Sequence, residues 1–177
     1  LPAETLKTLP PNATRFYTSG RYGFEWNLDA WSGFPAARER LYAAAKEAKA
    51  RLVTLAGDSH TAWANELHDQ GGQIRGVEFA CTSVTSNGAG DNLLVKDLNW
   101  LMAEANPEVA YYNAFAKGFT MVTIRPDEVS AEYVTVSTVR SKSYFAATDA
   151  RFVVRPNEVG GMGGLHRVMG DAGVRAG

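Results

Sequence analysis

A short apolar run that ends in a cluster of reactive side chains constrains this chain more than any other stretch. Residues 52–56 read Leu-Val-Thr-Leu-Ala, which is typical of a buried β-strand. Gly57 ends the run, and Asp58, Ser59 and His60 follow without a break. In open α/β sheets, binding and catalytic groups gather just beyond the carboxyl ends of strands. We therefore expect the loop after this strand to carry the chemistry.

The residues before the strand predict an α-helix from Pro35 to Ala50. Proline is favoured in the first helical turn, where its missing N–H costs no hydrogen bond. Apolar residues recur at helical spacing: Phe34, Ala37, Leu41, Ala45 and Ala48. The helix leads directly into the strand, so we expect a mixed α/β fold.

The residues after His60 favour β-structure interrupted by one helix. Residues 62–80 predict a hairpin that turns at Gly71-Gly72, although 61–69 could instead form a short helix. A polar loop follows, and an amphipathic helix is expected between a cap at Asp91 and a stop at Asn106-Pro107. Further strands are expected at 109–115, 119–124, 129–139 and 151–155.

The 177 residues correspond to roughly one domain, which we divide into three parts. Residues 1–33 form an irregular arm rich in aromatic residues, which either seals an edge of the core or forms a wall of a substrate cleft. Residues 34–156 form the main folded part. Residues 157–177 form a Gly-rich tail, which we expect to be mobile from Gly160 onward unless another chain holds it.

Charge and hydropathy exclude two classes of partner. The net charge is −1, and the 18 basic and 19 acidic residues are mixed along the chain, so nucleic acid is not expected as a partner. No apolar run approaches the roughly 18 residues that a membrane span needs. The single cysteine, Cys81, excludes an internal disulfide framework.

The loop at 57–60 supports a metal site as one hypothesis. A carboxylate and an imidazole two residues apart, at Asp58 and His60, can face one ion, and this pair suits iron, zinc or manganese. Two ligands do not complete a site, because zinc takes at least three from the protein. The remaining histidines, His68 and His166, are poorly placed to help. Most ligands of such a metal would therefore lie outside these 177 residues.

Two other hypotheses remain open from the residues alone. Strand-Gly-Asp-Ser also begins a family of serine esterases, in which Ser59 would attack an ester with help from a histidine base. That histidine normally follows an aspartate by three residues, whereas Gly163 holds this position before His166. Alternatively, Asp58 and Ser59 make only turn hydrogen bonds, and the chain is a non-catalytic binding module.

Several blocks, taken together and in order, resemble the carboxyl-terminal part of the alkaline phosphatase D family, which comprises secreted bacterial metallophosphoesterases. Residues 28–38 are similar to its Asp-x-Trp-Asp-Gly-Tyr-x-x-x-Arg segment, with departures at Ser32 and Phe34. Residues 57–63 resemble its Gly-Asp-x-His-x-x-Trp block, and residues 77–86 its Val-Glu-Phe-x-x-Thr-Ser-x-x-Ser block. Asn106-Pro107 and residues 117–119 resemble landmarks near its end.

The resemblance implies a layered β-sandwich with flanking helices that hydrolyses phosphomonoesters or phosphodiesters with a metal-activated water. Residues 34–156 would be the carboxyl-terminal part of the metallophosphoesterase domain. Asp58 and His60 match the last metal-binding motif, and the implied ions are calcium and iron. Ser59 would be a spacer, and no residue of this chain is assigned as a catalytic acid or base. Thr82, Ser83 and Asn87 would line or support the substrate cleft.

The earlier metal-binding motifs of the family are absent, since the sequence has no Asp-x-His pair and no Gly-Asn-His motif. We therefore expect this chain to be the carboxyl-terminal portion of a larger enzyme, whose missing amino-terminal part supplies the other ligands. On this view the 177 residues are inactive alone. The resemblance also implies a periplasmic or secreted location.

Overall fold

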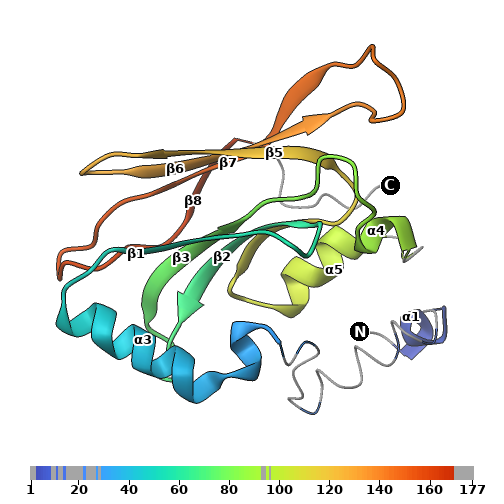
Figure 1. Ribbon diagram of the computed structural model, residues 1–177. Helices are drawn as coiled ribbons and strands as arrows, with labels where there is room; N and C mark the ends of the chain where they lie inside the picture. Colours follow the sequence, from blue (N-terminus) through green and yellow to red (C-terminus); the bar gives the residue numbers. More distant parts are fainter. Residues whose placement is uncertain are drawn as a thin grey trace.

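The computed structural model describes residues 3–8, 11, 14, 22, 27, 29–92, 95 and 97–169. Two β-sheets stack on each other, and helices lie under the first sheet (Figure 1). The first sheet has the strand order β1 (Leu52–Ala56), β3 (Ile74–Ala80), β2 (Ala62–His68), β4 (Val109–Asn113). The second has the order β5 (Lys117–Ile124), β6 (Val129–Val136), β7 (Ala146–Val154), β8 (His166–Met169). The helical segments are α1 (Ala3–Thr8), η1 (Trp31–Gly33), α3 (Pro35–Glu47), α4 (Ala89–Asn92) and α5 (Leu98–Ala105).

The predicted hairpin forms the middle of the first sheet. Strands β2 and β3 pair antiparallel, while β1 pairs with β3 in parallel. Asp69 closes the turn, because its Oδ1 accepts hydrogen bonds of 2.9 Å from the backbone N–H groups of Gly71 and Gln73. The bond from Gln73, followed by the contact with Arg75, holds the pKa of Asp69 below its usual value. Arg75 therefore forms an ion pair within this turn, 2.6 Å from the Asp69 carboxylate.

The two sheets enclose the main core. Its buried residues come from both layers: Ala62, Ala64, Val77, Phe79 and Tyr111 from the first sheet, and Val129, Ala131, Tyr133, Ala150, Phe152 and Val154 from the second. Along the strands of both sheets, buried side chains alternate with more exposed ones, and the buried ones point into the space between the sheets. A polar contact also links the layers, because the Tyr133 hydroxyl donates to the backbone carbonyl of Trp63. The expected layered α/β sandwich is confirmed.

A second, smaller cluster lies between the first sheet and α5. Leu98 from the helix packs there with Val109 and Tyr112 from β4. Trp63 joins this cluster, and its ring lies 4.2 Å from that of Tyr112. Trp63 is therefore a packing residue.

Strand β1 has the predicted bounds but is not buried. It pairs with β3 on one side, and no described residue pairs with it on the other. As a result Leu55 is 62% exposed. An edge strand keeps one row of backbone groups unpaired, so an apolar run alone cannot distinguish it from a central strand.

The helix expected from Asp91 is shorter than predicted. Its end at Ala105 is confirmed, but α5 starts only at Leu98. Asp91 does not cap α5; it lies within α4, and its carboxylate accepts a hydrogen bond of 2.7 Å from the Gly88 N–H. Asp97 precedes α5 with a φ of 61°, a backbone angle that breaks a continuous helix. Leu94, which we expected in this helix, lies outside the described residues.

The expectation of a mobile Gly-rich tail is wrong for residues 160–169. Met162 is 2% exposed and belongs to the main core. Strand β8 then pairs with β7 and completes the second sheet. The β7 strand also begins at Ala146, earlier than the expected 151, because backbone pairing with β6 continues through small and polar residues. These pairings depend on partners distant in sequence.

Little of the aromatic arm falls within the described residues. Phe16, Tyr17, Phe24 and Trp26 lie outside them, so neither reading of the arm is tested. Trp31, in η1, is 53% exposed. No helix in the described ranges has the length and apolar character that crossing a bilayer requires.

Candidate metal-binding loop

The loop of residues 57–61 joins β1 to β2 and carries both predicted metal ligands. Asp58 and His60 have φ values of 64° and 56°, in the left-handed region that side chains other than glycine seldom adopt. Only Ser59 separates these two residues, and each left-handed backbone conformation raises the free energy of the folded state by on the order of 1–3 kcal/mol. The surrounding contacts must therefore hold this backbone, and strained residues of this kind cluster at functional sites.

The imidazole of His60 is fixed by one hydrogen bond. Its Nδ1 lies 2.7 Å from the backbone carbonyl oxygen of Asn87. A carbonyl can only accept, so Nδ1 carries a proton, and in the neutral imidazole Nε2 then has the free lone pair. No hydrogen bond joins Nε2 to another described residue. Metal-binding histidines commonly have this arrangement, in which the outer N–H donates to a carbonyl and the other nitrogen binds the ion.

Neighbouring loops support the backbone of His60. The Thr82 hydroxyl lies 3.1 Å from the His60 carbonyl oxygen and 2.8 Å from that of Ala116, and it can donate to either. Gly88 approaches so closely that an added Cβ would lie 2.5 Å from the same His60 oxygen. Asn87 and Thr82 therefore lie beside the loop, where they support it. Ser83 instead donates a 2.5 Å hydrogen bond to Ser86 within its own loop.

Asp58 and Ser59 differ in their surroundings. The Asp58 side chain is exposed, and no hydrogen bond or ion pair joins it to a described residue, which leaves its oxygens available. Ser59 Oγ lies 3.0 Å from the hydroxyl of Thr61, which accepts a 2.7 Å hydrogen bond from Trp63 Nε1. No histidine takes part in this chain of bonds, whereas a serine nucleophile needs an adjacent base.

The described residues contain two suitable donors but no complete metal site. No group of three or more His, Cys, Asp or Glu residues lies close enough together within them to hold an ion. His68 contacts Glu66 at 3.1 Å, and His166 lies in β8, so neither joins Asp58 and His60. The carboxylate and the imidazole with a free Nε2 fit an ion as part of a larger ligand set.

One ion pair beside this loop was not anticipated from the sequence. Lys117, only 9% exposed at the start of β5, contacts the Asp91 carboxylate at 2.7 Å. The hydrogen bond from Lys117 is the main cause that holds the pKa of Asp91 below its usual value, and the bond from Gly88 adds to it. The pair ties β5 to the segment that supports His60. A lone lysine before an apolar run offers no sequence signal for this role.

Comparisons with known proteins extend this picture. Residues 6–133 match the family model described as PhoD-like phosphatase, which covers more than half of the chain. The chain belongs to the PhoD-like phosphatase family. The predicted family resemblance is confirmed.

Two PhoD relatives show how much of such a protein this chain represents. Alkaline phosphatase D of Bacillus subtilis (strain 168) is 31% identical over 140 residues, which are 76% of this chain and 24% of that protein. The solved structure of PhoD is 28% identical with a TM-score of 0.64, and the match covers 83% of this chain and 30% of that one. The chain therefore spans about a quarter to a third of the length of these relatives.

Proposed function

We propose that this chain is the carboxyl-terminal part of a PhoD-like enzyme that hydrolyses phosphomonoesters or phosphodiesters with a metal-activated water. Asp58 and His60 are two of the metal ligands in this proposal. The observation that carries it is the 2.7 Å contact from His60 Nδ1 to the Asn87 carbonyl, which leaves Nε2 free to bind an ion.

In this proposal, contacts within the chain would hold Asp58 and His60 in position as metal ligands. Bound ions, which we expect to be calcium and iron, lower the pKa of water and neutralise charge on the phosphoryl group. The contact of His60 Nδ1 with the Asn87 carbonyl orients the ring so that Nε2 can face an ion, and the Asp58 carboxylate adds a second donor. Thr82 and Gly88 keep the His60 backbone in its strained conformation. The loop is thus preorganised, which reduces the cost of placing both ligands.

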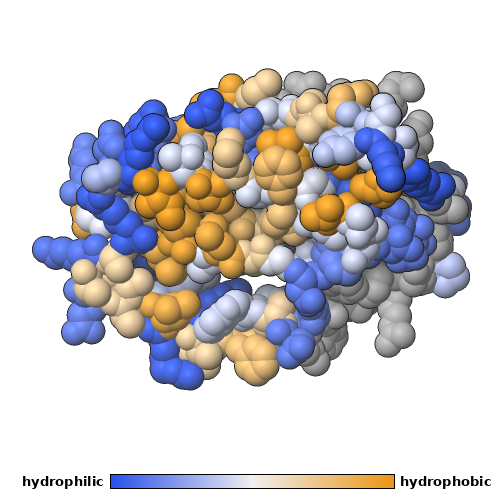
Figure 2. All heavy atoms as spheres, turned by 45° about the horizontal axis from the view of Figure 1, so that its top comes forward, coloured by the Kyte–Doolittle hydropathy of each residue, from blue (hydrophilic) through white to orange (hydrophobic). Residues whose placement is uncertain are grey.

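The remaining ligands would come from the missing amino-terminal part of the same enzyme. The chain covers 24% and 30% of its two relatives, which leaves ample sequence for them. One side of the sandwich is suited to receive that part, because two edge strands expose apolar side chains there. Leu55 in β1 is 62% exposed and Ile124 in β5 is 68% exposed. Figure 2 shows apolar side chains gathered in the middle of one face of the molecule.

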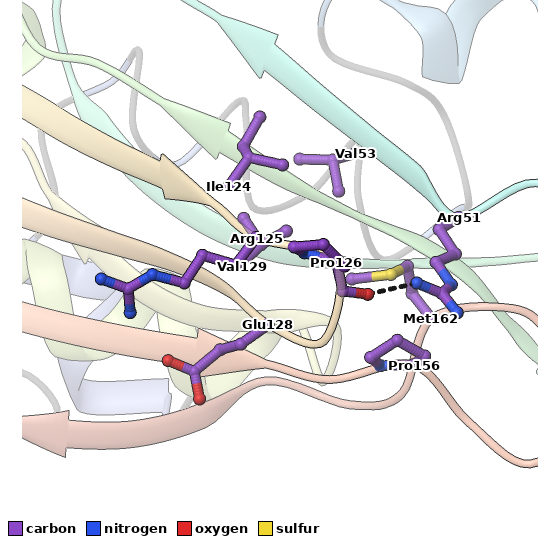
Figure 3. A pocket seen from close by; sticks show the side chains of 9 residues that line it. All are labelled: Arg51, Val53, Ile124, Arg125, Pro126, Glu128, Val129, Pro156 and Met162. Carbon is purple, nitrogen blue, oxygen red and sulfur yellow. Dashed lines mark hydrogen bonds between the residues drawn. The ribbon is translucent and has the colours of Figure 1, made fainter.

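A pocket of about 280 Å³ opens between these two edge strands (Figure 3). Val53, Ile124, Val129 and Met162 give it an apolar lining, and the Arg51 side chain closes one end by donating to the Pro126 carbonyl. Arg51 precedes β1, whereas the metal loop follows β1, so the pocket lies at the opposite end of that strand. We interpret the pocket as an apolar space that the amino-terminal part of the enzyme would fill.

We also propose a periplasmic or secreted location for the enzyme.

The proposal is tested in the complete protein that contains this chain. Asp58→Asn and His60→Ala should each reduce bound metal, measured by elemental mass spectrometry. Each should also lower hydrolysis of bis(p-nitrophenyl) phosphate by about 100-fold or more, because both ligands contact the ion. The 177-residue chain alone should show no hydrolysis.

Ser59→Ala is the matched variant within the same loop. It should keep both metal and activity, since among the described residues the Ser59 side chain hydrogen-bonds to Thr61 alone. Unchanged metal content and full activity in both ligand variants would refute the proposal. Covalent labelling of Ser59 by a fluorophosphonate, together with loss of activity in Ser59→Ala, would instead support the serine esterase.

A further inference from the structure

The β6–β7 hairpin, residues 137–145, exposes rings that the core does not use. Tyr144 is 60% exposed and Phe145 is 71% exposed. Hydroxyl groups hold the hairpin instead of apolar packing: Thr138 Oγ1 accepts from Arg140 N–H at 3.1 Å, Ser141 Oγ from Ser143 N–H at 3.1 Å, and Ser137 Oγ from Phe145 N–H at 3.2 Å. The rings are therefore presented to solvent by an ordered turn.

The hairpin starts beside the metal-binding loop. The Thr82 hydroxyl reaches both the His60 carbonyl and the Ala116 carbonyl, which places the start of β5 next to that loop. Lys117, the first residue of β5, pairs with Val136, the last residue of β6. From there the hairpin projects beyond the second sheet at the end of the sandwich that holds α4 (Figure 1).

The strand pairing places Phe145 near the start of β5, the part of the second sheet that lies beside the metal loop. Phe145 pairs with Ser137 through a 2.9 Å backbone bond, so it lies two strands from the start of β5. Neighbouring strands are about 4.8 Å apart, so the backbone of Phe145 lies roughly 10 Å from the start of β5. Electrostatics agrees with this placement, because Arg140 at the tip adds to the larger effects of Lys117 and Gly88 in lowering the pKa of Asp91.

We propose that this hairpin binds the alcohol part of the phosphate ester, with Tyr144 and Phe145 contacting an aromatic or apolar group. The inference rests on the proposed function, since it takes the metal loop as the place where the phosphate binds. Arg140 and Lys142 make the same hairpin cationic, which suits an anionic ester. The hairpin lies beyond residues 6–133, the part that the family model matches.

The test compares two phosphonates that differ only in the group facing the hairpin. In the complete protein, calorimetry should show phenylphosphonate binding roughly three- to ten-fold more tightly than methylphosphonate, a range expected for contacts between aromatic rings. The double variant Tyr144→Ala/Phe145→Ala should bind both ligands equally. Tyr144→Phe should keep the preference, because the ring remains. Val159→Ala is the control, since Val159 is 82% exposed and lies outside the hairpin.

Hydrolysis gives a second readout. The double variant should lower kcat/KM for phenyl p-nitrophenyl phosphate by a similar factor and leave methyl p-nitrophenyl phosphate unchanged. Equal affinity of the wild type for the two phosphonates would overturn the inference, as would a preference that survives in the double variant. A lower melting temperature of the double variant with an unaltered preference would also overturn it, and would assign the rings to contact with another part of the protein.

The two proposals can fail separately. A phenyl preference that depends on the rings, in a protein that holds no metal and hydrolyses neither ester, would refute the proposed function and retain the hairpin site. Metal-dependent hydrolysis with no preference between the phosphonates would retain the function and remove the hairpin site.

Discussion

His60 is positioned mainly by residues around it. Its ring is oriented by the Asn87 carbonyl, and its own carbonyl lies against Thr82 and Gly88. The positive φ of His60 needs these contacts, because an isolated residue would relax to a commoner conformation. Residues that would not contact the metal ion can thus decide whether the metal-binding nitrogen of His60 is in place.

Gly88→Ala tests this dependence. The new Cβ would lie 2.5 Å from the His60 carbonyl oxygen, and the loop carrying Asn87 must move away. We expect metal affinity of the complete protein to fall about 10- to 100-fold, as for other changes to groups that orient a metal ligand. Gly57→Ala is the control in the same region, because its Cβ would meet nothing within 4 Å. Equal losses in the two variants would show that the close approach is unimportant.

Thr61 makes a second residue-scale prediction. Its side chain is buried, and its hydroxyl bonds with Ser59 and accepts from Trp63 Nε1. Thr61→Val should lower the free energy of unfolding by about 1–3 kcal/mol, because the partly buried indole N–H of Trp63 loses its partner. Urea denaturation measures the change. Thr61→Ser keeps the hydroxyl and should recover most of the loss; if it does not, the missing methyl group is responsible.

At the scale of elements, an ion pair connects β5 to α4. Lys117 is nearly buried at the first position of β5, and Asp91 lies in α4. The lowered pKa of Asp91 means that the folded state favours its ionised form. That stabilisation is present at pH values above the usual carboxyl value of about 4 and is lost as the pH falls through the lower folded pKa.

Lys117→Met should therefore destabilise the protein at pH 7, and the difference from the wild type should shrink in acid, once the pH falls below the lowered pKa of Asp91. Thermal melts at the two pH values measure both effects. Lys142→Met changes an exposed lysine of the hairpin and should have little effect at either pH. A Lys117→Met effect that is the same at both pH values would mean that packing, and not the charge pair, stabilises this junction.

At the scale of the whole molecule, tyrosines stabilise the packing between layers. Burial is the main cause that raises the pKa of Tyr111 and Tyr133, and it raises the pKa of Tyr112 to about 12. Tyr111 and Tyr133 also lie ring against ring, with centroids 4.7 Å apart. A raised folded pKa stabilises the folded state below the unfolded value of about 10, and the effect is lost as the pH rises above it.

We therefore expect stability to fall steadily above about pH 10. The tyrosinate absorbance of these buried rings should rise together with unfolding followed by circular dichroism. Tyr133→Phe removes one titrating group and should make the loss with pH less steep. The same change should cost about 1 kcal/mol at neutral pH, because the hydrogen bond to the Trp63 carbonyl is lost. Ionisation of all tyrosines before any unfolding would contradict this account.

The open side of the sandwich makes the last prediction. Ile124 is 68% exposed in this chain, so Ile124→Asn should change the stability of the isolated 177 residues by only about 0.5 kcal/mol or less. In the complete protein the same change should cost about 1–3 kcal/mol, because the side chain would be buried. Denaturant titration of both proteins measures the contrast. Equal small effects would mean that this side stays exposed to water.

The sequence by itself determined much of the local structure. The apolar run of β1, the hairpin of β2 and β3, and the end of α5 follow from period, turn residues and a helix stop within short windows. Asp58 and His60 could be named as candidate ligands for the same reason, because both side chains lie two residues apart in one loop. The family blocks also depend only on residue order.

The tertiary structure alone decided what depends on partners distant along the chain. Strand β8 forms because β7 offers it an edge, and Lys117 is buried because Asp91 lies beside it. The free Nε2 of His60 follows from a carbonyl 27 residues away, and the exposure of β1 follows from its place at the edge of the sheet. A local pattern reports the period of its own segment, whereas these features arise from contacts between segments, which that period does not encode.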